Sequence, residues 1–410
     1  GLYPSFFLSR FKTVLTLNGK TEEAGSVLGL RRVLVIFQFF VAAVLIIGTL
    51  SVLKQVSLLQ NKHLGFDRDA LVAVRMIDRF AGANYLNLKN ALLEESDVLS
   101  VALSSEIPGG QAFHGLEVNP EGFPRGTMSM NSLGMDEDFL PTYNLTLKSG
   151  RNFTKDIVTD GRDAVILNES AIKALGWTAE EALGKDFEFT VYTGGAEVRP
   201  ASVIGVVADF NYQTLHHQVE PLVLYVNKHP YYSDFLTVKF ASGDLKEALD
   251  LLRAKWQEFH REKPIDFTFL DDELQKRYAS EMRIGQLFAS FAALSIAISC
   301  LGLLGLSAFS AQRRVKEIAI RKVMGATASQ ILRLLSIEYI AMITIAVVIA
   351  GPFAYYFADQ WLEGFPYRVA LGLETFVFTL ALSVLIGLIT VGLQSMRVTL
   401  INPAKTLKSD

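Results

Sequence analysis

Residues 313–333 carry the sequence RRVKEIAIRKVMGATASQILR, and a long uncharged run flanks them on each side. Each run is long enough to cross the hydrocarbon core of a membrane, so the sequence predicts a short loop between two spans. Short loops rich in Lys and Arg stay on the cytoplasmic side. We expect this loop to face the cytoplasm, because one acid, Glu317, stands against six basic residues: Arg313, Arg314, Lys316, Arg321, Lys322 and Arg333.

The loop is predicted to fold as a helix, a turn and a second helix. Gly325 is expected to end the first helix, as a glycine at C′ does, and residues 327–330 are typical of a capping box that starts the second. The residues alone leave two roles open: an amphipathic helix anchored to anionic headgroups, or a docking surface for a cytosolic partner. Either role is consistent with an amphipathic helix, because five apolar residues recur at helical spacing. They are Val315, Ile318, Ala319, Val323 and Ala326.

The segment KEIAIRKVMGA, residues 316–326, resembles the signature cytoplasmic loop of the FtsX/MacB-like ABC transporter permeases. In that family the loop carries the coupling helix, which sits in a groove of the ATPase subunit. The resemblance implies that Gly325 is a hinge and that the following residues contact a cytosolic ABC ATPase: Glu317, Ile318, Ile320, Arg321, Lys322, Val323, Met324, Gly325 and Ala326. Other resemblances to the family are VVADFNYQTLHHQVEPLVLYV (206–226), WLEGFPYR (361–368) and the ending NPAKTLKSD.

The opening sequence, GLYPSFFLSRFKTVLTLNGK, resembles the segment that joins the two halves of long Bacteroidetes-type permeases of this family. That resemblance implies that the chain is the second half of a longer polypeptide. The GKT at residues 19–21 does not predict a P-loop, because a P-loop needs glycine where this chain has Val14.

Composition is that of a protein that is part membrane and part soluble domain, with 50% hydrophobic and 20% charged residues. Residues 54–286 hold 34 acids and 24 bases, whereas the rest of the chain is basic and lies beside the spans. This distribution follows membrane topology and predicts no nucleic-acid partner. The single cysteine, Cys300, lies in a hydrophobic run and excludes a disulfide framework and a cysteine-based metal site.

Four hydrophobic runs predict transmembrane helices over residues 33–53, 287–311, 334–357 and 375–395. The flanking charges place segments 1–32, 312–333 and 396–410 in the cytoplasm, with 54–286 and the short loop 358–374 outside. The chain is therefore expected to be a multi-pass membrane protein, and the resemblance implies the bacterial inner membrane with a large periplasmic domain. In the loop 358–374, the aromatic residues of WLEGFPYR are expected at the membrane interface.

The outer residues are predicted to contain two β-α-β units, over 71–105 and 235–270. Two such units suggest a split ferredoxin-like layer, with residues 106–234 inserted between them. Inside the insertion we expect a helix over 170–175 and four strands: 164–168, 187–192, 202–207 and 222–226. This agrees with the family's outer region, a porter-like subdomain that carries a small β-rich subdomain. The fold class is thus a four-helix membrane bundle with an α+β extracytoplasmic domain.

Several features of the spans are predicted from single residues. No helix breaker separates residue 273 from residue 310, so one uninterrupted helix is expected to leave the outer domain and cross the membrane. Glu338 is expected to be solvated or paired with Arg333, and Pro352 should kink the third span. Four small residues allow close helix packing, within the chain or at a dimer seam: Ala293, Ala297, Gly302 and Gly305.

The outer domain shows no pattern of catalytic or cofactor-binding residues. His216 and His217 are adjacent and cannot easily face one metal, so polar surface is the favoured interpretation. The acids at 136–138 are interpreted as a helix start, and those at 271–273 as an N-cap with acids in the first turn. We expect no metal, no cofactor and no enzyme active site in this chain.

The resemblance implies a permease subunit or half-permease of a mechanotransmission ABC transporter, in which a separate ATPase hydrolyses ATP and cargo is handled outside the membrane. Two alternatives stay open: an FtsX-like transmitter that regulates a cell-wall hydrolase, and a lipoprotein-release permease. Expected partners are the ATPase, membrane lipid, and a second copy or another permease half. The sequence leaves open a periplasmic or outer-membrane partner, and the cargo.

Overall fold

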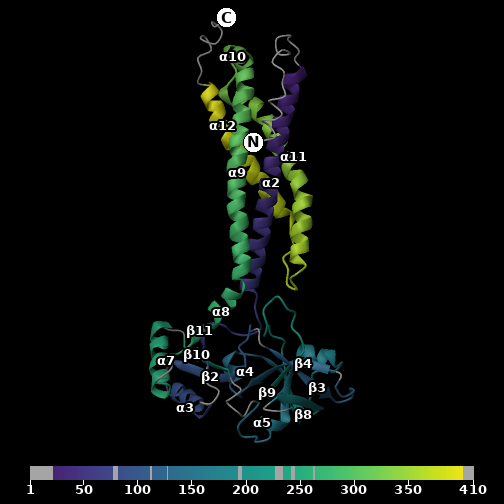
Figure 1. Cartoon of the computed structure of the whole chain (residues 1–410), viewed down its shortest axis with the longest axis vertical. Coiled ribbons are helices and arrows are strands. Elements are labelled where there is room, and N and C mark those ends of the chain that lie inside the picture. Colours follow the sequence, from purple (N-terminus) through teal and green to yellow (C-terminus); the bar gives the residue numbers. More distant parts are fainter. Residues whose placement is uncertain are drawn as a thin grey trace. The chain divides into compact units, whose positions relative to one another are not determined.

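The computed structural model describes residues 22–76, 82–110, 113–126, 128–192, 196–226, 234–241, 245–261 and 264–399. The chain divides into two compact units, whose elements are labelled in Figure 1. The membrane unit lies within Gly1–Val56, Glu281–Glu363 and Val369–Asp410, and the outer unit consists of Ser57–Ser280 and Gly364–Arg368. Most of the predicted cytoplasmic segment 1–32 and of the tail 396–410 lies outside the described residues.

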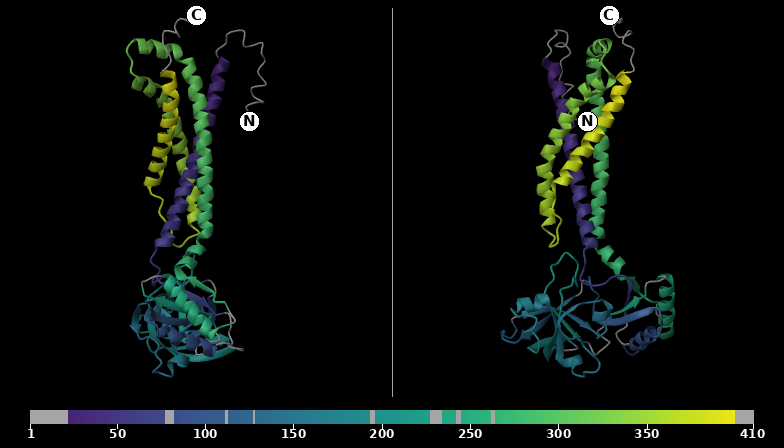
Figure 2. Two further views of the ribbon diagram at one scale, coloured as in Figure 1. Left: turned by 90° about the vertical axis from the view of Figure 1, so that its left-hand side faces the viewer. Right: turned by 180° about the vertical axis from the view of Figure 1, so that it is seen from behind.

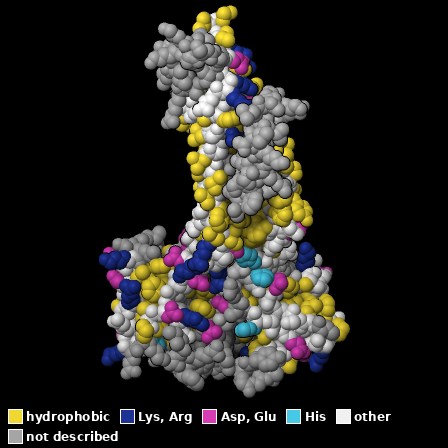
Figure 3. All heavy atoms as spheres, turned by 45° about the horizontal axis from the view of Figure 1, so that its top comes forward, with side chains coloured by type: hydrophobic (Ala, Val, Ile, Leu, Met, Phe, Trp, Pro, Cys, Tyr) yellow, Lys and Arg dark blue, Asp and Glu magenta, His cyan; other side chains and the backbone are white. Residues whose placement is uncertain are grey.

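Four described helices are long and apolar enough to cross a membrane, as the sequence predicts. They lie in α2 (Glu22–Asn61), α9 (Ala279–Arg313), α11 (Ala328–Leu362) and α12 (Leu373–Thr399). Each helix is longer than the span predicted inside it, because flanking residues continue the helix beyond the apolar stretch. On the face shown in Figure 3, hydrophobic side chains line these helices. Helix α11 continues through Pro352, so the predicted kink stays a prediction.

The core of the membrane unit draws on all four long helices. It includes Phe39 of α2, Leu303 of α9, Ile343 of α11 and Val391 of α12. Of the four small residues singled out on α9, Gly302 packs inside the chain: a Cβ there would lie 2.3 Å from Oε1 of Gln38. The other three are exposed on α9: Ala293, Ala297 and Gly305.

The prediction of one uninterrupted helix from residue 273 to residue 310 is wrong at Tyr278. Helix α8 (Leu270–Arg277) ends there, at φ −99° and ψ 13°, and the Tyr278 N–H donates to the carbonyl of Gln275 at 3.1 Å. The Tyr278 side chain is buried, and its hydroxyl accepts the Leu215 N–H at 3.2 Å. Tertiary anchoring of this side chain therefore outweighs the helical preference of the local sequence.

A further prediction near the end of a helix needs correction. The acids at 271–273 do lie in the first turn of α8, but its N-cap is Phe269, which caps with no side-chain hydrogen bond. Phe365, one of the aromatic residues expected at the membrane interface, is buried in the outer unit, with its ring centroid 5.1 Å from that of His216. Its place relative to a membrane stays a prediction.

The ferredoxin-like layer of the outer unit is a four-stranded antiparallel sheet in the order β11-β1-β10-β2. Its strands are β1 (Leu71–Arg75), β2 (Val98–Ser104), β10 (Phe235–Phe240) and β11 (Phe267–Phe269). Helices α3 (Gly82–Leu93) and α7 (Leu245–Phe259) contribute Leu88, Leu92 and Trp256 to a shared core with the sheet. This is the arrangement that two β-α-β units predict.

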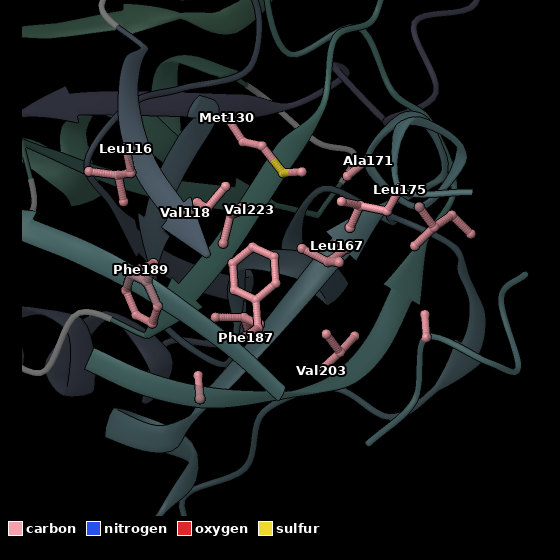
Figure 4. Packing of buried hydrophobic residues seen from close by; sticks show 14 of the residues in the cluster. Leu116, Val118, Met130, Leu167, Ala171, Leu175, Phe187, Phe189, Val203 and Val223 are labelled. Carbon is pink, nitrogen blue, oxygen red and sulfur yellow. The ribbon is translucent and has the colours of Figure 1, made fainter. Parts of the chain in front are cut away.

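The inserted residues form a closed barrel in the order β4-β3-β7-β8-β6-β9, with β9 returning to β4. Its interior is filled by apolar side chains such as Val118, Leu167, Phe187 and Val223 (Figure 4). The barrel joins the ferredoxin-like layer where Ser104 of β2 pairs with Met135 of β4, beside a hydrogen bond from the Ser105 N–H to the Gly134 carbonyl. The barrel strands are β3 (His114–Pro120), β4 (Met128–Met135), β6 (Ala164–Asn168), β7 (Asp186–Tyr192), β8 (Ala196–Val207) and β9 (Leu222–Val226).

Short elements complete the outer unit. Strand β5 (Leu147–Gly150) pairs with β8 outside the ring. The short helices are α4 (Phe139–Thr142), α5 (Asp160–Asp163) and α6 (Glu169–Ala174). The predicted helix start at 136–138 is present before α4, although Asp138 caps it without a side-chain hydrogen bond.

Candidate functional site

The candidate site is the turn from α9 through α10 (Val315–Val323) to α11, which Figure 2 shows at one end of the helices of the membrane unit. Gly325, at φ +91°, lies in the left-handed region that favours glycine. The Ala326 N–H donates to the carbonyl of Arg321 at 2.9 Å and the Gly325 N–H to that of Lys322 at 3.1 Å. These two bonds form a Schellman motif, so Gly325 ends α10 as predicted.

A capping box begins the next helix, also as predicted. The Gln330 N–H donates to Thr327 Oγ1 at 3.4 Å, and the Thr327 N–H donates to Gln330 Oε1 at 3.0 Å. The second helix of the loop is not a separate element, because α11 runs from Ala328 to Leu362 without interruption. The turn is thus continuous with the third span.

The apolar residues of the turn divide into a buried set and an exposed set. Ile318 is buried against Ile331 and Leu335 of α11, and Ala326 packs at the edge of this cluster. The spacing of Ile331 and Leu335, four residues apart on one helical face, is the sequence signal that could have indicated this contact. Ile318 therefore fixes α10 to α11 within the chain.

Three large apolar side chains of the turn point into solvent. Ile320 is 57% exposed, Val323 68% and Met324 83%. Residues 320, 323 and 324 lie on one helical face at i, i+3 and i+4. Arg321 and Lys322 are exposed beside them, and Arg321 donates to Glu317 at 2.8 Å in an i,i+4 pair. The residues expected to contact an ATPase thus form an apolar face with a basic rim.

An ion cluster supports the base of this turn. Glu338 of α11 accepts a hydrogen bond from Arg32 of α2 and lies 3.6 Å from a nitrogen of Arg314, the residue between α9 and α10. Glu338 is partly solvated, at 29% exposed, and Arg32 and Arg314 take the place of the expected partner Arg333. Sequence separation hides such partners, since Arg32 lies 306 residues from Glu338.

Phe309 of α9 adds a second contact at the same level. Arg31 lies 4.7 Å from the Phe309 ring centroid and Arg313 lies 4.9 Å from it. Guanidinium groups at these distances interact with the ring quadrupole. Basic residues that mark the cytoplasmic ends of α2 and α9 therefore also hold these ends together.

No group of three His, Cys, Asp or Glu side chains that could hold a metal occurs among the described residues. His217 is exposed, and His216 packs against the rings of Tyr278 and Phe365. Asp136 and Asp138 bind Lys89, with Nζ–Oδ2 distances of 2.5 and 2.6 Å. Asp136, Asp138 and His216 thus each have a partner within the chain.

The fold and the turn define a class: a multi-pass membrane protein with four helical spans, a structured cytoplasmic turn and an α+β outer domain. The profile of the MacB-like periplasmic core domain matches residues 39–254, and that of the FtsX-like permease C-terminal domain matches residues 289–403. The chain belongs to this family of FtsX-like permeases with a MacB-like periplasmic core. It is an inner-membrane protein whose large domain lies in the periplasm.

Curated relatives share part of their length with this chain. The macrolide export ATP-binding/permease protein MacB of Mannheimia succiniciproducens is 25% identical over 67% of this chain and 42% of its own length. The MacB of Aggregatibacter actinomycetemcomitans is 30% identical over 54% of this chain and 34% of its own length. The chain thus spans less than half the length of these relatives.

A solved structure also resembles the chain. The periplasmic region of MacB from Actinobacillus actinomycetemcomitans is 21% identical, covers 53% of this chain and 96% of its own, and has a TM-score of 0.36.

Proposed function

We propose that the chain is the permease subunit or half-permease of an ATP-driven transporter of the mechanotransmission type. The observation that carries this proposal is the exposed apolar face of Ile320, Val323 and Met324 on a helix that is fixed at both ends. Exposed apolar patches rimmed by polar residues are typical of protein interfaces. A helix laid into a groove of an ATPase uses anchors at this spacing.

ATP hydrolysis is assigned to a partner. The MacB relatives are named as proteins that combine ATP-binding and permease functions, and this chain has no P-loop, since Val14 stands where the motif needs glycine. We propose that a separate ATPase chain, or an ATPase segment elsewhere in the assembly, binds the exposed face of α10.

The mechanical path begins with the contacts that fix α10. Ile318 packs on Ile331 and Leu335, and Glu338 ties Arg314, the residue before α10, to Arg32 on α2. A force on α10 would therefore move α9, α11 and α2 together. Toward the outer unit, the break at Tyr278 separates α8 from α9, and we call this break the α8–α9 joint. Motion of α9 would therefore pass through this joint and not along one uninterrupted helix.

Of the predicted coupling residues, Ile318 and Ala326 are reassigned to holding the turn, and Glu317 to supporting Arg321. Ile320, Arg321, Lys322, Val323 and Met324 remain as the residues proposed to contact the ATPase. Cargo would be handled by the outer unit, and pairing with a second copy or another permease half would complete the transporter.

The test compares the tagged chain with an Arg321→Glu/Met324→Asp variant, both purified from detergent-solubilised membranes of the organism that makes them. Proteins that co-purify are identified by mass, and ATP hydrolysis is assayed. The matched control is Arg125→Glu/Val198→Asp, which makes the same kinds of change at exposed positions of the barrel.

We expect the parent and the control to retain an ATPase and its activity, and the loop variant to lose at least nine-tenths of both. Equal recovery of the ATPase by the loop variant would show that α10 does not dock it. An interfacial helix, the other role open to this loop, would instead appear as lost binding to anionic vesicles with ATPase recovery unchanged.

A further inference from the structure

Residues 364–368 are the last five of WLEGFPYR and belong to the outer unit, although both neighbouring segments of the chain belong to the membrane unit. Two aromatic side chains hold this segment. Phe365 is 7% exposed, and its ring centroid lies 5.1 Å from that of His216, with 38° between the planes. Lys62 Nζ lies 4.0 Å from the Tyr367 ring centroid. The loop between the third and fourth spans is therefore packed onto the outer unit.

A second segment next to a span packs on the same histidine. Leu270, Leu274 and Tyr278 recur every four residues along α8 and are all buried. The last of them, Tyr278, has its ring centroid 5.9 Å from that of His216, with 44° between the planes. Its hydroxyl also accepts the Leu215 N–H at 3.2 Å. Residues 215 and 216 thus hold the side chain at which α8 ends.

His216 therefore contacts two aromatic rings that come from distant parts of the chain. It lies between β8 and β9, in the stretch VVADFNYQTLHHQVEPLVLYV, one of the segments that resemble the family. This stretch has no role in the proposed ATPase contact. One neighbouring ring belongs to the α8–α9 joint and the other to the loop between α11 and α12. We call the three rings of Tyr278, His216 and Phe365 the aromatic clasp.

We propose that His216 is a positioning residue that couples the α8–α9 joint to the loop 364–368 through the aromatic clasp. Each ring contact is of the kind that contributes a small, geometry-dependent stabilisation. Because the imidazole makes both contacts, ordering of either segment favours ordering of the other. Its role in transmission rests on the proposed function: movement of the second span would reach the loop between the third and fourth spans by way of the barrel.

The experiment follows amide hydrogen exchange in the full chain, reconstituted in lipid nanodiscs without any partner. Peptides covering residues 274–284 and 362–369 report the two segments, and peptides from β9 report the barrel core. The variants are His216→Ala, which removes the central ring, and His216→Phe, which keeps a ring. His217→Ala is the matched control, because the neighbouring histidine is exposed.

His216→Ala should speed exchange about tenfold in both segments, the factor expected from one aromatic pair, while β9 stays protected. His216→Phe should restore protection, and His217→Ala should change neither segment. Phe365→Ala should speed exchange at residues 278–280 in the parent and add nothing in the His216→Ala background. If Phe365→Ala has no further effect once His216 is replaced, the two contacts are coupled through His216. Independent packing at the two contacts would instead give additive changes in exchange.

The proposal is overturned if His216→Ala loosens only one segment, if β9 loosens with them, or if the effects of His216→Ala and Phe365→Ala add. This result is independent of the ATPase assignment, because no partner is present. A companion measurement keeps the two proposals apart: His216→Ala should capture as much ATPase as the parent, whereas the loop variant Arg321→Glu/Met324→Asp should leave the exchange at both segments unchanged.

Discussion

The two units of this chain each contain an ion cluster built around one central charged side chain, and the two central side chains have opposite charge. In the membrane unit one acid, Glu338, is shared by two bases, Arg32 and Arg314. In the outer unit one base, Lys89, is shared by two acids, Asp136 and Asp138. The central side chains differ in burial, with Lys89 4% exposed and Glu338 29% exposed.

The difference shows what each cluster does. Lys89 lies on α3 and its partners lie between β4 and α4, so the outer cluster fastens a helix to its own domain, where a buried charge needs complete pairing. Glu338 lies near the cytoplasmic turn and joins α2, α11 and the residue before α10. A partly exposed cluster that joins separate helices contributes less to stability and more to the position of the turn.

The largest expected effect is on the outer cluster. Lys89→Met removes the cation that Asp136 and Asp138 share and leaves Lys155 Nζ, 3.9 Å from Asp138 Oδ2. Removing one partner of a buried pair typically costs about 3–5 kcal/mol. We expect a loss of this size in the unfolding free energy of the outer unit. The measurement is urea unfolding followed by the fluorescence of Trp256, which is buried in the ferredoxin-like core, with Trp177 and Trp361 replaced by Phe.

Lys185→Met is the control for this variant. Lys185 Nζ lies 2.5 Å from Glu121 Oε1, but both side chains are largely solvated, at 33% and 46% exposed. Surface pairs of this kind contribute little, so the unfolding transition should stay unchanged. Equal losses in the two variants would contradict the distinction between a buried and a surface cluster.

The next effect is a pH dependence at Asp136. Burial raises the pKa of Asp136 to about 6, although Lys89 and the Leu103 N–H act in the opposite direction. The charged groups around it are Lys89, Glu137, Asp138 and Lys155. The native state then holds a proton that the unfolded state, with a pKa of about 3.9, has lost. Stability from this group is complete below about pH 4 and declines as pH rises through 6, by about 3 kcal/mol in total.

Asp136→Asn should remove this slope, so the difference in unfolding free energy between parent and variant should change between pH 4 and pH 7 and be flat above it. Asp160 provides the contrast. Burial acts to raise its pKa, but hydrogen bonds from Arg151 and the Thr154 N–H outweigh burial and lower the pKa of Asp160. The contribution of Asp160 to the free energy of unfolding is lost only as pH falls below the ordinary pKa range of aspartate. A parent–variant difference that is constant from pH 4 to pH 7 would refute the role given to Asp136.

The sequence predicted the ferredoxin-like layer better than the barrel, and the reason is physical. The β1-α3-β2 and β10-α7-β11 units show clear hydrophobic periodicity within short windows. Strands β3 and β4, HGLEVNP and MSMNSLGM, are rich in polar and glycine residues and show no such pattern. Their pairing is decided by contacts across the barrel, as in the parallel pair of β4 with β9, about ninety residues apart.

The candidate site follows the same rule. Gly325 and the capping box were predictable, because a helix end depends on a few adjacent residues. The partners of Glu338 and the break at Tyr278 depend on side chains that are remote in sequence. The inward direction of Ile318 depends on Ile331 and Leu335 of the next helix. Local chemistry therefore predicted the turn at 313–333, and tertiary contacts decide which of its apolar side chains are exposed.

The smallest expected effect is on the membrane-unit cluster, and it tests whether this cluster positions the turn. Glu338→Gln leaves Arg32 and Arg314 without a shared carboxylate, so α10 should unfold locally more often. Trypsin should then cleave after Arg321 and Lys322 about tenfold faster in inside-out vesicles, because a charge-assisted hydrogen bond contributes a free energy of that size. Glu363→Gln is the control, because Glu363 is exposed at the C-cap of the same helix, α11. Unchanged cleavage in Glu338→Gln would mean that the Ile318 cluster alone holds the turn. The ion cluster of the membrane unit would then have no role in positioning the turn, whereas that of the outer unit would still stabilise its domain.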